Sequence, residues 1–419
     1  MSKYVINGGK KLFGKLYVPS SKNAVLPILA GSIMCDEKVV IKKIPYFSDV
    51  LIMLKILEEV GCKVNKFEDN IEIDTQNLHN FQLSENLTKD IRSSIFMLGP
   101  LLTKFKKAKV AYPGGCNIGL RPIDLHIKGL KALNVKIAEE YGFISCDGSN
   151  MKPATINLDF PSVGATENLI MASVKLKGKT TIINCAKEPE IIDLQNFLNS
   201  MGAKIVGAGS DTIEIEGVDR LHFSCYTPIP DRIIAGTYLI GVAMTGGNLL
   251  LENVKSQDLT ILIDKLKGIS CKIKCEYDKI YLESSGKLKS FGEISTSPYP
   301  GFPTDLQPQM MALATCLKGV SIIEENLFES RFKHIPELKK MGAKIILKDK
   351  CAIISGKNKL FGANVYATDL RAGSALVLAG LKAEGVTIVN DIHHIERGYL
   401  DLDKELKNLG ADILRLDEN

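Results

Sequence analysis

The stretch LNSMGAKI, residues 198–205, decides the fold because its pattern occurs six times along the chain. The shared pattern is Leu-x-x-apolar-Gly-x-Lys-apolar, with Asn134 and Ser270 replacing glycine in two copies and Asp412 replacing lysine in the last. The copies begin at Leu57, Leu130, Leu198, Leu266, Leu338 and Leu406, at intervals of 73, 68, 68, 72 and 68 residues. Glycine relieves the left-handed backbone at a helix end, and the Lys-apolar alternation begins a strand. Each copy therefore predicts a helix, its cap and a strand.

A second recurring element lies about 35 residues before each copy. It has a polar start and then an apolar segment, as in PDRIIAGTYLIGVAM, residues 230–244. The aligned polar positions are Lys22, Arg92, Gly164, Arg232, Asp305 and Arg371. These segments are apolar on nearly all sides, so each is predicted to be a buried helix. A repeat of this length indicates stacked or symmetric α/β units.

Six units exceed one compact core, so we expect two domains of three units. The best break is the segment 228–230, where two prolines stiffen an extended crossing. The sixth unit lacks closing strands after Leu406, whereas residues 1–20 hold strand-like segments. We therefore predict one domain over 21–228 and a second formed by 1–20 plus 229–419.

Composition excludes several classes of protein. The net charge of +5 is small for 419 residues, and basic and aromatic residues do not cluster as in nucleic-acid-binding proteins. No apolar run reaches the ~18 residues of a membrane span, and we identify no signal peptide. The ten cysteines form no C-x-x-C and no zinc-like spacing with histidine. We expect a cytoplasmic protein without metal, membrane or nucleic-acid partners; the oligomeric state is not predicted.

Arginine is used selectively. The chain has 53 Lys and Arg together, of which only eight are Arg. Six of the eight lie at the predicted helix starts of the repeat: Arg92, Arg232 and Arg371 at the first helix, and Arg121, Arg331 and Arg397 before the second. Helix N-termini attract anions, and guanidinium groups bind carboxylates and phosphates with two hydrogen bonds. The alternative for any single Arg is an ion pair with its neighbouring acid, such as Asp369 beside Arg371. The set favours anionic, phosphate-bearing small molecules.

The segment YPGGCNIGLRPIDLH, residues 112–126, is predicted to be an exposed glycine-rich loop. Cys116 lies five residues before Arg121, and a thiol near cations has a lowered pKa and is reactive. The alternative is a buried structural cysteine. The glycines fit neither a dinucleotide-binding fingerprint nor a phosphate-binding P-loop, so we predict no nucleotide cofactor.

TSPYPGFPTDLQPQMM, residues 296–311, holds four prolines around Asp305. A carboxylate held at a helix start serves either as a general base or as an N-cap, and both remain open here. Lys22 is similarly a phosphate ligand or a plain surface lysine. His126, His393 and His394 lack ligand spacing and are interpreted as structural.

Seven segments together carry a family resemblance: PSSKNAVLPILA (19–30), PGGCNIGLRPIDLH (113–126), SVGATEN (162–168), TSPYPGFPTDLQPQ (296–309), ENLFESRFKHIPEL (325–338), DLRAGSALVLAGL (369–381) and HIERGYLDLDKEL (394–406). Over its full length the chain resembles the UDP-N-acetylglucosamine enolpyruvyl transferases (1-carboxyvinyltransferases) of the EPSP synthase superfamily. This resemblance implies two inside-out α/β domains, each of three repeated units with buried helices and outer sheets.

The resemblance also implies an activity. The family transfers the enolpyruvyl group of phosphoenolpyruvate to the 3′-hydroxyl of UDP-N-acetylglucosamine and releases phosphate, without a cofactor. This reaction is the first committed step of peptidoglycan synthesis, on which cell-wall formation and cell division depend. Cys116 matches the family's proton donor, which can add covalently to phosphoenolpyruvate and is trapped by fosfomycin. Asp305 matches the proposed base on the 3′-hydroxyl.

Substrate contacts are implied position by position. Lys22 and Asn23 match phosphoenolpyruvate ligands. The positions that match sugar-nucleotide contacts are Arg92, Arg121, Pro122, Ile123, Asp124, Leu125, Asp305 and Leu327. Arg331, Arg371 and Arg397 match the basic cluster around phosphate and carboxylate, with Asp369 as its acidic neighbour.

Two other functions are weighed against this one. The shikimate-pathway enolpyruvyl transferase shares the fold, but the Cys116 loop argues against it. A catalytically silent sugar-nucleotide sensor is a different class, and the joint presence of Cys116, Asp305 and Lys22 argues against that.

Overall fold

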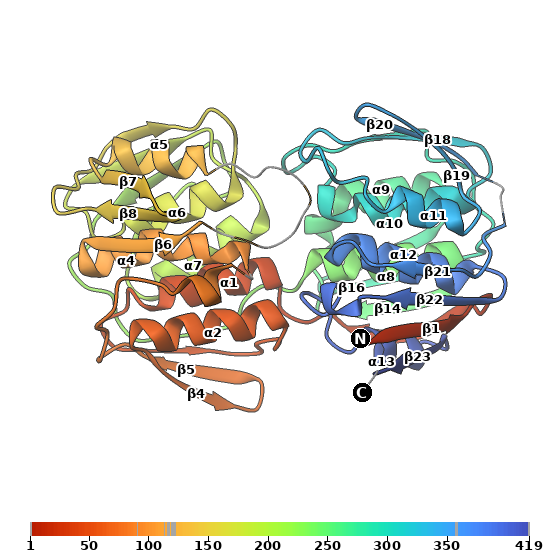
Figure 1. Ribbon diagram of the computed structural model, residues 1–419, viewed down its shortest axis with the longest axis horizontal. Coiled ribbons are helices and arrows are strands. Elements are labelled where there is room, and N and C mark those ends of the chain that lie inside the picture. Colours follow the sequence, from red (N-terminus) through yellow and green to blue (C-terminus); the bar gives the residue numbers. More distant parts are fainter. Residues whose placement is uncertain are drawn as a thin grey trace. The chain divides into compact units, whose positions relative to one another are not determined.

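The computed structural model describes residues 2–89, 91–112, 114, 118, 123–356 and 359–417. The chain forms two compact units (Figure 1). Unit 1 comprises Met1–Pro19, Asn117–Leu120 and Pro230–Asn419, and unit 2 comprises Ser20–Cys116 and Arg121–Ile229.

Unit 2 holds three sheets and their helices. Its strands are β3 (Lys38–Ile41), β4 (Lys63–Phe67), β5 (Asn70–Asp74), β6 (Lys107–Ala111), β7 (Lys136–Glu140), β8 (Phe143–Asp147), β9 (Thr155–Asn157), β10 (Lys179–Ile183), β11 (Lys204–Val206), β12 (Thr212–Glu216) and β13 (Ser224–Tyr226). Its helices are α1 (Lys22–Ser32), α2 (Ser48–Val60), α3 (Glu85–Thr88), the 3-10 helix η1 (Arg92–Met97), α4 (Leu98–Phe105), α5 (Asp124–Ala132), α6 (Val163–Ser173) and α7 (Pro189–Ser200).

Unit 1 is built in the same way. Its strands are β1 (Lys3–Asn7), β2 (Leu12–Tyr17), β14 (Gly247–Glu252), β15 (Lys272–Cys275), β16 (Lys279–Ser284), β17 (Glu293–Ser295), β18 (Val320–Glu324), β19 (Lys344–Lys348), β20 (Cys351–Ser355), β21 (Asn364–Tyr366), β22 (Val386–Asn390) and β23 (Asp412–Leu416). Its helices are α8 (Arg232–Thr245), η2 (Ser256–Leu259), α9 (Thr260–Gly268), η3 (Thr304–Leu306), α10 (Gln307–Cys316), α11 (Ile335–Lys340), α12 (Leu370–Lys382), η4 (Ile392–His394) and α13 (Leu402–Asn408).

The sheets repeat one strand order. In β17-β18-β20-β19 of unit 1, the first pair is parallel and the other two pairs are antiparallel. Sheet β13-β3-β5-β4 of unit 2 follows the same scheme. The sheet β6-β8-β7 has three strands, and a single parallel bridge between Gln82 and Lys109 stands beside β6 where the other sheets have a fourth strand. The sequence repeat is therefore a structural repeat, which confirms the predicted fold class.

Residues 3–17 complete two sheets of unit 1. Strand β1 lies between β22 and β23, so that Tyr4 faces Val389 on one side and Arg415 on the other. Strand β2 pairs in parallel with β14. Strand β1 thus gives the sixth repeat its full set of strands, and β2 is the fourth strand of the sheet that contains β14, β15 and β16.

The cap position of the repeat adopts the predicted left-handed conformation in every copy. The φ angles are 110° at Gly61, 65° at Asn134, 98° at Gly202, 85° at Ser270, 91° at Gly342 and 97° at Gly410. Glycine takes this conformation at no steric cost and asparagine at little, which explains the composition of the motif.

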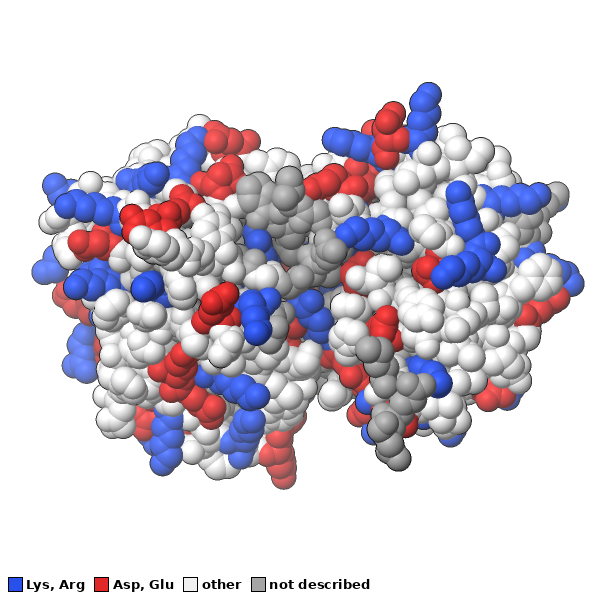
Figure 2. All heavy atoms as spheres, in the orientation of Figure 1, with Lys and Arg blue, Asp and Glu red and all other residues white. Residues whose placement is uncertain are grey.

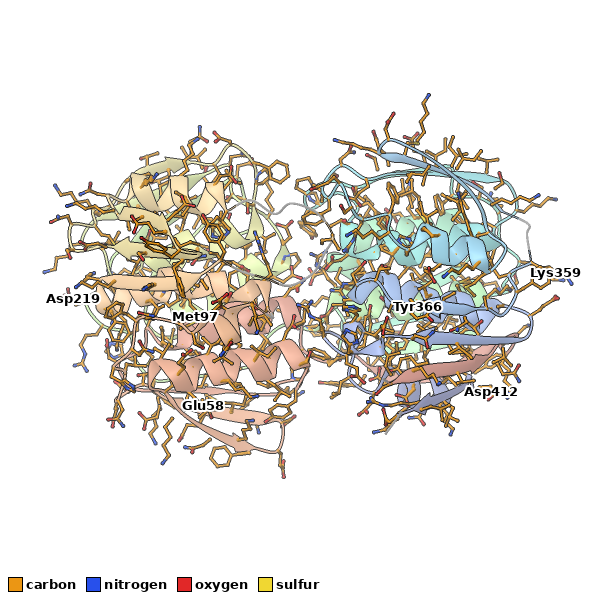
Figure 3. All side chains as sticks on the ribbon, viewed as in Figure 1. Glu58, Met97, Asp219, Lys359, Tyr366 and Asp412 are labelled. Carbon is orange, nitrogen blue, oxygen red and sulfur yellow. The ribbon has the colours of Figure 1, made fainter. Side chains whose placement is uncertain are left out.

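Among the described residues, the inner helices of unit 2 are α1, η1 with α4, and α6, and those of unit 1 are α8, α10 and α12; they form the two cores. All of α8 after Arg232 is buried, and so is α12 from Leu370 to Leu381. Figure 3 shows Met97 among the inner helices of unit 2, whereas Lys359 and Asp412 extend from the surface of unit 1. The predicted all-round burial of these helices is confirmed.

The surface carries charges of both signs. Figure 2 shows basic and acidic side chains interspersed over the drawn face of each unit. Among the described residues, no helix combines the length and hydropathy needed to cross a membrane.

Candidate active site

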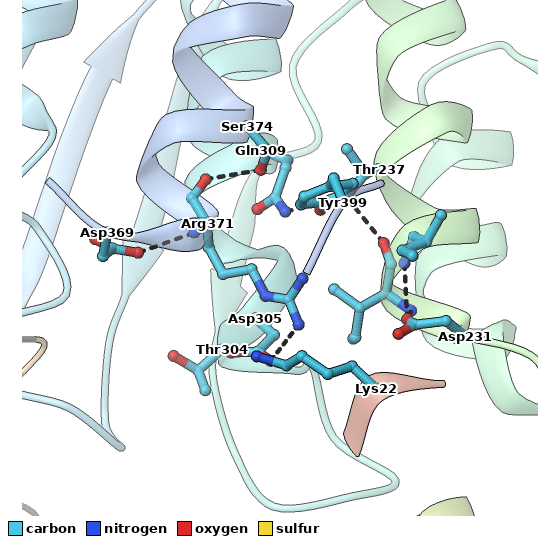
Figure 4. A network of polar contacts seen from close by, with 12 residues as sticks. Lys22, Asp231, Thr237, Thr304, Asp305, Gln309, Asp369, Arg371, Ser374 and Tyr399 are labelled. Carbon is cyan, nitrogen blue, oxygen red and sulfur yellow. Dashed lines mark hydrogen bonds and ion pairs between the residues drawn. The ribbon is translucent and has the colours of Figure 1, made fainter. Parts of the chain in front are cut away.

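Asp305 is the centre of a charged cluster in unit 1 (Figure 4). Its Oδ1 lies 2.6 Å from Arg331 Nη2, and its Oδ2 lies 3.0 Å from Arg371 Nη2. The N-cap of α10 is Leu306, and no side chain caps that helix. The interpretation of Asp305 as an N-cap is therefore wrong, because its carboxylate binds two guanidinium groups instead.

Asp369 has the capping role in this cluster. Its Oδ1 accepts hydrogen bonds from the backbone N–H groups of Arg371 and Ala372, at 3.0 and 3.1 Å, and so caps α12. The same oxygen lies 3.8 Å from Arg331 Nη1. For Arg371 the ion pair with a sequence neighbour is wrong, because its side chain binds a carboxylate 66 residues away.

The two arginines are held in the protein interior. Arg331 is 1% exposed, and its Nε and Nη2 donate to the Thr304 carbonyl at 3.2 and 3.1 Å. Burial lowers the pKa of Arg371, but nearby Asp305, Tyr399 and Asp231 raise it by more, so its pKa lies above the ordinary value. These contacts hold both guanidinium groups in fixed directions, as recognition of an anion requires.

His334 lies beside this cluster and was not predicted. It is fully buried, and its ring nitrogens have no hydrogen-bond partner among the described residues. Burial lowers the pKa of His334 to about 4, so the ring is neutral at pH 7. A neutral imidazole adds no second positive charge next to Arg331.

Glu325 is a second residue that sequence reasoning missed. It is buried, and its Oε1 accepts hydrogen bonds from Thr296 Oγ1 at 2.9 Å and from the Leu327 backbone N–H at 3.0 Å. Its Oε2 accepts from Thr304 Oγ1 at 2.9 Å. Glu325 thus fixes both the residue before Asp305 and the predicted contact Leu327. The signal in the sequence was the acidic pair Glu324 and Glu325, which stands where β18 ends.

The predicted ligands at the first repeat lie in unit 2. Lys22 opens α1 and is buried, with Nζ 3.2 Å from Asp49 Oδ2. It is therefore not a plain surface lysine. Asn23 is half-buried in the same first turn, and Arg92 is half-buried at the start of η1.

The remaining predicted positions are distributed as follows. Ile123 is buried immediately before α5, Asp124 is exposed and Leu125 is half-buried. Arg397 is half-buried in the turn between η4 and α13. Cys116, Arg121 and Pro122 lie outside the described residues.

The cluster in unit 1 supports two kinds of chemistry. Its fixed guanidinium groups can bind a phosphate or carboxylate, and the Asp305 carboxylate can accept a proton. Within the described part of the chain, no group of three or more His, Cys, Asp or Glu side chains could hold a metal ion.

Comparisons with known proteins agree on one family. A family model described as EPSP synthase (3-phosphoshikimate 1-carboxyvinyltransferase) matches residues 6–406. The chain is 50% identical over 416 residues to UDP-N-acetylglucosamine 1-carboxyvinyltransferase 2 of Caldanaerobacter subterraneus subsp. tengcongensis, covering 99% of this chain and 100% of the relative. It is 47% identical over 418 residues to UDP-N-acetylglucosamine 1-carboxyvinyltransferase 2 of Clostridium tetani, with 99% and 100% coverage.

Two solved structures share the fold. The enolpyruvyl transferase NikO from Streptomyces tendae superposes with a TM-score of 0.90 at 23% identity, covering 99% of this chain and 98% of that one. The EPSP synthase from Acinetobacter baumannii gives a TM-score of 0.75 at 19% identity, with 100% of both chains covered. At these identities the likeness concerns the fold alone.

Proposed function

Since the chain belongs to the EPSP synthase (3-phosphoshikimate 1-carboxyvinyltransferase) family, we propose that it transfers the enolpyruvyl group of phosphoenolpyruvate to the 3′-hydroxyl of UDP-N-acetylglucosamine. Phosphate is the second product. The acceptor follows from the relatives, which are 44–50% identical over nearly the whole chain and carry that name. The reaction places the enzyme at the first committed step of peptidoglycan synthesis, and we propose that it works in the cytoplasm.

The observation that carries the mechanism is the convergence of Arg331 and Arg371 on Asp305. Two adjacent cations stabilise a carboxylate and make it a weak base. A substrate anion that binds these guanidinium groups in place of Asp305 would leave the Asp305 carboxylate less stabilised and therefore more basic. We infer that binding of phosphoenolpyruvate activates the base that the second substrate needs.

The proposed reaction has two stages. Asp305 accepts the proton of the 3′-hydroxyl as that oxygen bonds to C2 of phosphoenolpyruvate, and the Cys116 thiol protonates C3. A C3 proton then passes to the Cys116 thiolate, which restores the double bond as the C2–O bond to phosphate breaks, and the proton on Asp305 leaves with the phosphate. Arg331, Arg371 and Arg397 are proposed to hold the phosphate and carboxylate and to stabilise the negative charge that the phosphate gains as it leaves. Lys22 and Asn23 are proposed as further phosphoenolpyruvate ligands.

The sugar nucleotide is proposed to contact a separate set of residues: Arg92, Arg121, Pro122, Ile123, Asp124, Leu125, Asp305 and Leu327. We further propose that the catalytic pair is divided between two domains, 21–228 with Cys116 and 1–20 plus 229–419 with Asp305.

Acceptor choice tests the function. Phosphate release from phosphoenolpyruvate is measured with UDP-N-acetylglucosamine and, in parallel, with shikimate 3-phosphate. We expect turnover only with the sugar nucleotide. Turnover only with shikimate 3-phosphate would assign the shikimate-pathway reaction. Binding of the sugar nucleotide without any phosphate release would indicate a silent sensor.

The role of Cys116 has its own test. We expect fosfomycin to alkylate Cys116, because its thiol is proposed to lie near cations that lower its pKa. Cys225 and Cys275 are exposed thiols and serve as internal controls in the same sample. Mass spectrometry should place the adduct on Cys116 and leave those two unmodified. Cys116→Asp should keep activity, since a carboxylic acid also donates a proton, and should escape the drug. An adduct on all three thiols would show that exposure alone determines which thiols fosfomycin alkylates.

A further inference from the structure

Arg371 lies against an aromatic ring as well as against Asp305. Its Cζ is 5.8 Å from the centroid of Tyr399, which is within the range of a cation–π interaction (Figure 4). Tyr399 is 2% exposed, so water does not compete for this contact. The Arg371 guanidinium is therefore bounded by Asp305 through a hydrogen bond and by the Tyr399 ring through this contact.

The hydroxyl of Tyr399 is fixed by a threonine on a different helix. Tyr399 Oη lies 2.7 Å from Thr237 Oγ1 on α8, and either hydroxyl could be the donor by distance alone. Thr237 Oγ1 also donates to the Ile233 carbonyl at 2.8 Å and accepts from Gln309 Nε2 at 3.1 Å. A threonine hydroxyl has one hydrogen and two lone pairs. The hydrogen is used by Ile233, so Tyr399 must donate to the remaining lone pair.

The hydrogen and both lone pairs of the Thr237 hydroxyl are therefore all in use. Thr237 is 1% exposed on α8, and Gln309 is fully buried on α10. The ring that contacts Arg371 on α12 is thus tied to the two other inner helices of unit 1. Gln309 Oε1 has no hydrogen-bond partner among the described residues, whereas the Thr237 and Tyr399 hydroxyls are paired, and displacing either hydroxyl would leave a buried polar group unpaired.

Tyr399 also anchors the chain around Arg397. Its backbone N–H donates to the Ile395 carbonyl at 3.0 Å, which closes the turn that contains Arg397. Gly398 packs so closely on Leu370 that a Cβ there would lie 2.8 Å from Leu370 Cδ2. One tyrosine therefore connects to two of the three arginines of the proposed phosphoenolpyruvate site.

We propose that Tyr399, held by Thr237 and Gln309, is a positioning residue that fixes Arg371 and the Arg397 turn for binding of the phosphoenolpyruvate anion. The proposal rests on the proposed function for the identity of that anion. It assigns no contact between Tyr399 and substrate, since the residue acts through the two arginines.

Matched substitutions test it. Thr237→Val and Tyr399→Phe remove one hydroxyl each and nearly conserve shape, whereas Thr237→Ser keeps the hydroxyl. A control is Tyr238→Phe, because Tyr238 is a buried neighbour on α8 whose hydroxyl donates to Glu405. Loosening a cation–π contact is expected to raise the KM for phosphoenolpyruvate roughly 3- to 30-fold in Thr237→Val and Tyr399→Phe. Thr237→Ser and Tyr238→Phe should keep the wild-type KM for phosphoenolpyruvate. The KM for UDP-N-acetylglucosamine should stay at its wild-type value in all four variants.

Two measurements separate this proposal from general loss of stability and from the proposed function. Melting temperature is recorded for each variant, and we expect Tyr238→Phe to be destabilised without a change in the phosphoenolpyruvate KM. Affinity for inorganic phosphate is measured by calorimetry independently of turnover.

Wild-type turnover with an unchanged phosphoenolpyruvate KM in Thr237→Val and Tyr399→Phe would overturn the positioning role alone. Absent wild-type turnover, with phosphate binding weakened only in those two variants, would overturn the proposed function and support the positioning role. A wild-type protein that neither turns over nor binds phosphate would overturn both.

Discussion

The starts of α12 in unit 1 and α6 in unit 2 occupy equivalent places in the repeat but treat buried charge differently. At α12, Asp369 caps the helix and the Arg371 side chain binds Asp305. At α6, Ser162 is the cap, and Glu167 is fully buried without a hydrogen-bond partner among the described residues. Burial, then the charges of Glu190 and Glu188, raise the pKa of Glu167 well above its ordinary value.

This difference indicates under which condition a buried helix start carries a charge in this fold. Three of the four groups in the unit 1 cluster are almost fully buried, and opposite charges converge there from three segments of the chain. Glu167 has no such partner, so the protonated form is the stable one. We conclude that a buried helix start in this fold can hold either paired charges or an uncharged carboxyl. Which of the two occurs depends on whether an opposite charge lies beside it.

Removing the central carboxylate should give the largest effect. Asp305→Asn is expected to lower turnover by roughly 10²–10⁴, because a general base is lost while the side-chain shape is kept. Affinity for UDP-N-acetylglucosamine should change far less, since one hydrogen bond to a charged group contributes about 1.5–3 kcal/mol. Asp159→Asn is the control, because Asp159 forms an exposed pair with Lys128 at 2.6 Å. Near-normal turnover of Asp305→Asn would show that the base lies elsewhere.

Replacing an arginine of the unit 1 cluster by an uncharged residue should lower the stability of the fold. Arg331→Met is expected to lower the free energy of unfolding by about 3–5 kcal/mol, because it leaves buried carboxylate charge without a partner. Arg415→Met removes an arginine whose partners, Glu396 and Asp417, lie at the surface, and should cost less than about 1 kcal/mol. Urea unfolding of both variants gives the two values. Equal losses would contradict the distinction between buried and exposed pairs.

The uncharged state of Glu167 should appear in the pH dependence of stability. A carboxyl whose folded pKa is raised stabilises the fold fully below the unfolded pKa of about 4.5, and that contribution is lost as pH rises. Unfolding free energy should therefore fall between pH 5 and pH 8, and Glu167→Gln should reduce that fall. Glu214→Gln, at an exposed pair with Lys179, is the control and should keep the wild-type difference. An unchanged slope in Glu167→Gln would mean that Glu167 is ionised in the fold.

Cap strength should give the smallest effect. Ser162 accepts one long hydrogen bond, from Ala165 N at 3.4 Å, whereas Asp231 caps α8 with two, at 2.8 and 2.9 Å. Alanine at a cap costs about 0.5–2 kcal/mol, so we expect Ser162→Ala near the low end and Asp231→Ala near the high end. Melting temperatures of the two variants rank them. The reverse order would show that cap geometry does not set helix stability here.

The repeat could be predicted from sequence because its signals are local. The cap position of LNSMGAKI needs a left-handed residue, and the inner helices are apolar on all sides, so both follow from short segments. The pairing of Asp305 with Arg331 and Arg371 could not be predicted, because it joins segments 26 and 66 residues apart in sequence. Sequence spacing suggested ion pairs with neighbouring acids, but Asp369 and Asp231 use their oxygens to cap helices.

The buried polar partners were also beyond sequence reasoning. Thr237 and Tyr399 are separated by 162 residues and look like ordinary core positions. In the sequence Glu325 looks like an exposed residue at the end of a strand, yet its carboxylate is buried and accepts hydrogen bonds from the side chains of Thr296 and Thr304 and from the Leu327 backbone N–H. Such groups become visible only when each buried donor and acceptor is accounted for.

The position of β1 between β22 and β23 has a consequence for synthesis on the ribosome. Asn7 pairs with Val386 and Asp412, so the earliest strand emerges long before either of its neighbours. At ~5–20 residues per second, the nascent chain waits roughly 20–80 s for β22 to be translated. During that interval β1 has no partner strand, and β2 has none until β14 is translated, so both could pair with other chains; the lysines at 3, 10, 11 and 15 are well placed to discourage it. Vectorial translation thus completes the strands of unit 2 first and leaves closure of unit 1 to the end.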